Sequence, residues 1–210
     1  MAHTAYRLLV AAALAGSVVA AYEPTLDRRA IADAIAIGQS RIEVQHTRLH
    51  QAYRIPVGRP PVDHIEIVTP FRRVVLTIEA SARAGDRIFG ERDALAALAD
   101  GNVIALIVEL TFHPLNTFQT VPVYDVALAP AGTPVIRPRD LERSPRYGVR
   151  IDGVSPGAPS VSPGSQPLLG ATLNARFDGR LLKPNGVYDA VVSEAGKEVA
   201  RARIDLGRLR

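Results

Sequence analysis

Residues 103–112 form the most apolar run of the chain beyond its N-terminus, and they constrain the fold more than any other segment. In an extended conformation this run is apolar on both faces. One face carries Ile104, Leu106, Val108, Leu110 and Phe112, and the other carries Val103, Ala105, Ile107, Glu109 and Thr111. Such a pattern predicts a central strand with other strands or a second sheet on one side and helices on the other.

Shorter patterns predict the elements around this strand. Alternation of apolar and polar residues predicts further strands at 62–68, 121–128, 169–177, 187–193 and 197–206. Helical spacing predicts a helix over 25–50 with a kink or break at Gly38, a helix that follows Thr69 and stops at Gly85, and a short helix over 91–99. The prolines near residue 60 predict an extended connection, and the arginine-rich stretch 137–150 predicts a solvated loop.

Together these elements predict an α+β protein with a mostly antiparallel, β-sandwich-like core, an N-terminal helix and a two-helix insertion. We expect residues 21–152 to supply the helices and first strands of the core, 153–167 to form a Gly/Ser/Pro-rich loop or linker, and 168–210 to add three strands that complete the core. Three strands with one apolar face are marginal alone, which favours a single core. The alternative is that 153–167 links two domains.

The N-terminus has the pattern of a cleaved signal peptide over residues 1–20. Arg7 supplies a short positive region, residues 8–19 are apolar, and Val18 and Ala20 occupy the −3 and −1 positions of a small-residue cleavage site. We therefore expect an exported protein, periplasmic or extracellular, whose mature chain begins near Ala21 or Tyr22 and has no membrane span. A buried N-terminal helix and an uncleaved anchor are the alternatives.

The composition and the absence of several motifs exclude or disfavour several classes of function. The chain has no cysteine, which excludes disulfides, thiolate metal sites and cysteine nucleophiles. Its formal charge is +4, and 23 of its 25 basic residues are arginine, scattered among acids. Export and the absence of any nucleic-acid-binding signature argue against a nucleic-acid partner. The local motifs of serine hydrolases, zinc proteases, phosphate-binding loops and calcium loops are also missing.

Glu43, His46 and His50 are the candidate metal ligands. They fall at positions i, i+3 and i+7 and would share one face of the helix predicted over 25–50. Imidazole nitrogens with a carboxylate can hold zinc or copper, and His113 is a distant candidate for a further ligand. The alternative is a solvated helix face with a Glu–His pair.

Glu109 and His113 are the candidate catalytic residues. With Thr111 they share one face of the apolar strand and its exit. Burial could raise the pKa of Glu109 toward that of a general acid, with His113 as a base. Alternatively, Glu109 binds an arginine or backbone amides, and His113 opens an ordered turn.

A third group, Asp63, His64 and Glu66, cannot form one site on a regular strand, because Asp63 lies on the opposite face from the other two. His64 and Glu66 are expected on an exposed face.

These observations favour a non-enzymatic, exported β-rich protein that binds another envelope or secreted protein, or a polysaccharide surface. We expect it to need no cofactor and to be metal-free as purified. One alternative is a hydrolase or metal-dependent enzyme that uses Glu109 and His113, or the helix face of His46 and His50. Another is a carrier that holds a small apolar ligand between helices and sheet.

Overall fold

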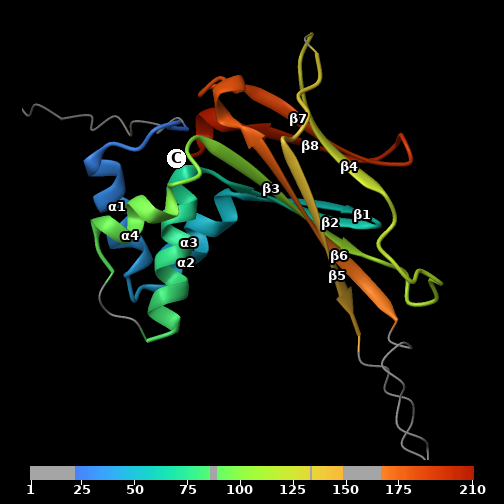
Figure 1. Cartoon of the computed structure of the whole chain (residues 1–210), viewed down its shortest axis with the longest axis horizontal. Helices are drawn as coiled ribbons and strands as arrows, with labels where there is room; N and C mark the ends of the chain where they lie inside the picture. Colours follow the sequence, from blue (N-terminus) through green and yellow to red (C-terminus); the bar gives the residue numbers. More distant parts are fainter. Residues whose placement is uncertain (1–21, 86–88, 133, 149–166) are drawn as a thin grey trace, which may run out of the picture.

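The computed structural model describes residues 22–85, 89–132, 134–148 and 167–210. Two antiparallel sheets pack face to face, and the helices gather at one end of them (Figure 1). The five-stranded sheet runs in the order β1 (Arg54–Arg59), β2 (Val62–Val68), β3 (Val103–Thr111), β6 (Leu168–Asp178) and β5 (Asp140–Tyr147). The three-stranded sheet runs β4 (Tyr124–Pro130), β7 (Val187–Glu194) and β8 (Lys197–Asp205). The predicted α+β, sandwich-like fold class is confirmed.

The apolar run is the central strand of the larger sheet. β3 pairs with β2 on one side and with β6 on the other. Leu106 and Leu110 are buried in the core between the two sheets, together with residues of all three strands of the smaller sheet. On the opposite face, Val103 is buried but Thr111 is exposed. The helices therefore cover only the beginning of this face, where Arg73 donates a hydrogen bond to the Val103 carbonyl at 2.7 Å.

The three C-terminal strands divide between the two sheets. β6 pairs with β3 along its length, from Val103 opposite Asp178 to Thr111 opposite Gly170. β7 and β8 form a hairpin in the smaller sheet and bury Val192 and Ile204 in the core that also contains Leu106. The expected linker over 153–167, apart from Pro167, and the expected signal peptide lie outside the described residues.

Two strands were not predicted, and both lie at an edge of the larger sheet. β1 contains Pro56, and β5 contains Pro145. An edge strand tolerates a proline because one side of its backbone has no partner strand to bond. Most residues of both strands are exposed: β1 alternates only over its first four residues, where Ile55 and Val57 are half-buried, and β5 does not alternate. The segments expected to be an extended connection and a solvated loop are therefore paired strands.

The helix predicted over 25–50 is two helices, α1 (Arg28–Gly38) and α2 (Glu43–Ala52). Asp27 caps α1 by accepting a hydrogen bond from the Ala30 amide at 2.7 Å. Gly38 ends α1 against α3 (Pro70–Arg83), where an added Cβ would lie only 2.8 Å from the Ile78 Cβ. This close approach, rather than flexibility, explains the glycine at the break.

α1, α3 and the short α4 (Glu91–Ala97) form a second apolar cluster of their own. As expected, Thr69 caps α3: its side chain accepts from the Arg72 amide at 3.2 Å, and Pro70 is the first residue of the helix. α2 differs from its neighbours because none of its residues is buried. None of the helices in these described ranges combines the length and apolar character of a membrane span.

Candidate metal centre

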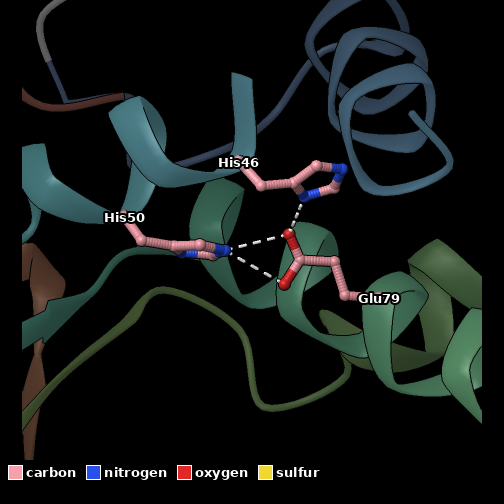
Figure 2. Close-up of side chains that lie close together, drawn as sticks. All are labelled: His46, His50 and Glu79. Carbon is pink, nitrogen blue, oxygen red and sulfur yellow. Dashed lines mark hydrogen bonds and ion pairs between the residues drawn. The ribbon is translucent and has the colours of Figure 1, made fainter. Parts of the chain in front are cut away.

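Three side chains from two helices converge beside the helical cluster. His46 and His50 lie one turn apart on α2, and both rings point at the carboxylate of Glu79 on α3 (Figure 2). His50 Nε2 lies 2.9 Å from Oε1 and 3.0 Å from Oε2 of Glu79, and His46 Nδ1 bonds to Oε1. One ligand atom from each of the three residues can be chosen so that all lie within 4.8 Å of one another.

The spacing of the histidines along α2 and the place of Glu79 on α3 explain why these side chains meet. Positions i and i+4 of a helix face the same way, so His46 and His50 present one surface to the neighbouring helix. Glu79 follows the core residue Ile78 on α3 and is itself buried, with 5% of its side chain exposed. A buried carboxylate is costly unless it accepts hydrogen bonds, and the two imidazoles supply them.

The hydrogen bonds of His46 favour its protonated form. Its Nε2 lies 2.7 Å from the Ser40 carbonyl while its Nδ1 faces Glu79, so each ring nitrogen has an oxygen partner to which a protonated ring can donate. The hydrogen bond to Glu79 raises the pKa of His46, and the bond to the Ser40 carbonyl adds to this effect.

His50 is placed differently. Its Nε2 donates to Glu79, whereas its Nδ1 is buried and has no hydrogen-bond partner among the described residues. Arg83, one turn beyond Glu79 on α3, approaches the same carboxylate at 3.4 Å. The carboxylate thus receives contacts from three positive or potentially positive groups.

The cluster opens into a pocket of about 590 Å³. The pocket walls come from the loop before α2, from α2 and α3, and from the edge of the larger sheet at Arg54 and Glu66. Three protein ligands on one side and open space on the other is an arrangement that leaves a coordination position for water or a ligand.

The donor set suits a divalent transition metal. Two imidazole nitrogens and a carboxylate oxygen are ligands that Zn²⁺ accepts. The hydrogen bond from His46 Nε2 to the Ser40 carbonyl is the outer contact that orients a metal-bound histidine and leaves Nδ1 toward the ion. The deprotonated histidines would then bind through His46 Nδ1 and His50 Nε2.

Of the metal ligands predicted from the sequence, the structure brings together His46 and His50 but not Glu43. Glu43 lies in the first turn of α2 and is exposed on the pocket wall. Glu79 was not predicted as a ligand. It lies four residues after Val75, at the border of the apolar face of α3, and this position was the available signal that its carboxylate is buried. His113, the distant candidate, is exposed in the turn after β3, where its Nδ1 accepts from the Leu115 amide at 3.1 Å.

The candidate catalytic pair is not joined. Glu109 is half-buried and accepts from the Thr172 hydroxyl at 2.8 Å, a partner on the neighbouring strand β6. Thr111 donates instead to Asp63 at 2.5 Å. Within the described ranges, no hydrogen bond connects Glu109 with His113, so these two residues do not form an acid–base pair in this conformation.

The expected division of the third group is wrong, because β2 has a bulge between Val62 and His64. Asp63 accepts from Thr111, which lies on the same face of β3 as Glu109, the residue opposite His64. Glu66 forms an ion pair with Arg72 at 2.6 Å and lies 3.4 Å from His64 Nε2, and the His64 and Glu66 side chains are partly buried rather than exposed. Arg54 on β1 donates to His64 Nδ1 at 3.1 Å. This polar network adjoins the metal-centre pocket through Arg54 and Glu66.

Comparison of this chain with protein families, with curated proteins and with solved structures finds no match, so the proposal below depends on the geometry of the site alone.

Proposed function

We propose that this protein binds a divalent metal ion, with Zn²⁺ the best fit, through His46 Nδ1, His50 Nε2 and the carboxylate of Glu79. The observation that carries the proposal is the convergence of these three groups from two helices (Figure 2), all of them lining an open pocket. A divalent ion would take the place of the protons that now lie between the imidazoles and the carboxylate.

The competing interpretation is an interhelical ion pair that joins α2 to α3 and never holds metal. Two features favour the metal. One carboxylate faces two imidazoles, although a single histidine would be enough for a pair. The outer hydrogen bond to the Ser40 carbonyl fixes the ring of His46 in the orientation that coordination through Nδ1 requires.

The test is a calorimetric titration of metal-free protein with Zn²⁺, with the metal content of the complex measured by elemental analysis. We expect one ion per chain. Glu79→Gln and His50→Ala should each weaken binding by at least about tenfold, since even losses outside the ligand set cost about ten- to a hundredfold in affinity.

Two matched controls locate the site. Glu43→Gln changes the carboxylate that the sequence alone suggested, and His113→Ala removes an exposed imidazole outside the cluster; both should bind Zn²⁺ like the unmodified chain. Stoichiometric binding that survives Glu79→Gln, or the absence of stoichiometric binding by the unmodified chain, would disprove the proposed site.

Export and a non-enzymatic role in binding stay predictions beside this proposal. A metal-binding protein is compatible with both, and a thiol-free ligand set would be insensitive to an oxidising compartment. Fractionation of producing cells, with the chain detected by mass spectrometry in the exported fraction, tests the location independently of metal binding.

A further inference from the structure

Three arginines line the same pocket as the His46–His50–Glu79 cluster. Arg41 comes from the loop between α1 and α2, Arg54 from the first position of β1, and Arg83 from the last position of α3. They approach from three separate elements, so they surround the space above the cluster rather than forming a row along one helix face.

The guanidinium groups of Arg83 and Arg41 are available to a ligand, whereas that of Arg54 already donates to His64. The Arg83 side chain is 77% exposed, and its one ion pair is the 3.4 Å contact with Glu79. Arg41 is exposed and forms no ion pair with any residue that the structure describes. By contrast, Arg72 is buried and committed to Glu66 and to the Ile67 carbonyl.

The charge of the pocket depends on the metal. Three arginines and three glutamates line it, so their formal charges cancel, and a divalent ion that displaces the proton from His46 raises the net charge by one. Of the glutamates, Glu66 is neutralised by Arg72, and Glu79 would be a metal ligand. A divalent ion therefore leaves the pocket with an excess of positive charge, concentrated beside the open coordination position.

We propose that the metal-loaded pocket binds a phosphoryl or phosphonyl oxyanion, with one oxygen in the open metal position and the others paired with Arg83 and Arg41. This inference rests on the proposed metal-binding function and names the class of ligand for that site. Arginine suits the role because its planar fork of N–H donors matches phosphoryl oxygens. At about 590 Å³ the pocket also has room for a group attached to the oxyanion.

The probe is methylphosphonate, added to the Co²⁺-loaded protein, whose visible absorption reports the ligands of the ion. We expect methylphosphonate to change the Co²⁺ spectrum saturably and to bind at least about tenfold more tightly to the loaded than to the metal-free protein, the latter measured by calorimetry. The dimethyl ester of methylphosphonate, which keeps the phosphonyl group but carries no charge, should leave the spectrum unchanged.

The double variant Arg41→Gln/Arg83→Gln tests the arginines. It should still bind Co²⁺, with an affinity measured separately because Arg83 contacts the Glu79 carboxylate, and should lose about tenfold or more in methylphosphonate affinity, the loss expected when charge-assisted hydrogen bonds are removed. Arg48→Gln is the control, because Arg48 is an exposed arginine of α2 that does not line the pocket. Its methylphosphonate affinity should be unchanged.

Titration with Co²⁺ alone comes first and separates the two proposals. If the unmodified chain does not bind Co²⁺, the metal site and the inference built on it are both wrong. If it binds Co²⁺ but methylphosphonate leaves the spectrum unchanged, or binds the double variant equally well, the metal site stands and the oxyanion inference is wrong.

Discussion

Replacement of Phe177 by alanine should destabilise the whole folded chain. Phe177 lies on β6 opposite Ile104 of β3, and its side chain is fully buried in the core between the two sheets. It therefore connects the C-terminal strands to the central strand, across a stretch of the sequence that the structure does not describe.

The expected cost follows from how little the neighbours can move. The nearest residue on the same face of β6 is Ala175, whose side chain is too small to fill the space that the ring leaves. The strands on both sides of β6 hold its backbone in place. We expect a loss of about 3–5 kcal/mol in the free energy of unfolding, the range for a buried phenylalanine whose cavity stays open.

Urea unfolding followed by circular dichroism measures this loss, and thermal unfolding should show a fall in Tm of roughly 6–20 °C. Leu115→Ala is the control, since this leucine is 83% exposed and should change stability by no more than about 0.5 kcal/mol. A loss below about 1 kcal/mol for Phe177→Ala would refute the idea that β6 packs in the same core as β3.

Three further predictions concern other parts of the chain. Gly38→Ala should destabilise the protein by about 1–2 kcal/mol in urea unfolding, because a Cβ would lie 2.8 Å from a side-chain carbon of α3 and this crowding outweighs the gain in helix propensity. The Asp178 carboxyl should titrate with a pKa of about 2 in NMR, lowered chiefly by its hydrogen bond from Arg180, and Arg180→Gln should move the pKa back toward its ordinary value. Because this pKa is depressed, any contribution of Asp178 to stability is present at neutral pH and is lost as the pH falls toward 2. Amino-terminal sequencing of exported protein should begin at Ala21 or Tyr22, and an exported chain that starts at Met1 would contradict cleavage.

The sequence predicts those strands that have an alternating pattern of apolar and polar residues within their own segment. β2 spans residues 62–68, as its alternation indicates, and β6, β7 and β8 lie within one residue of their predicted bounds. Each of these strands has one face in the core, and burial of one face imposes the period of two. The edge strands β1 and β5 are held by backbone hydrogen bonds to β2 and β6 with little side-chain burial, so the period of two is absent from β5 and is limited in β1 to Ile55 and Val57.

The residues of the metal centre also differ in whether a local sequence pattern predicts them. His46 and His50 are visible as a pair because helical spacing puts them on one face of α2. The third ligand, Glu79, belongs to another helix. Its identity depends on how α2 and α3 lie relative to each other in the folded protein. Spacing within a single helix pointed to Glu43, which lies in solvent, whereas Glu79 reaches the histidines only through tertiary packing.

The composition of α2 bears on what the cluster is for. With no buried residue, this helix has only half-buried side chains such as Leu49 to hold it against the rest of the protein. If the sole task of His46, His50 and Glu79 were to hold α2 in place, apolar side chains of similar size would do it as well, because desolvation of a buried ion pair offsets much of its attraction. A divalent ion changes this balance, since its binding energy would be added directly to the stability of the α2–α3 contact.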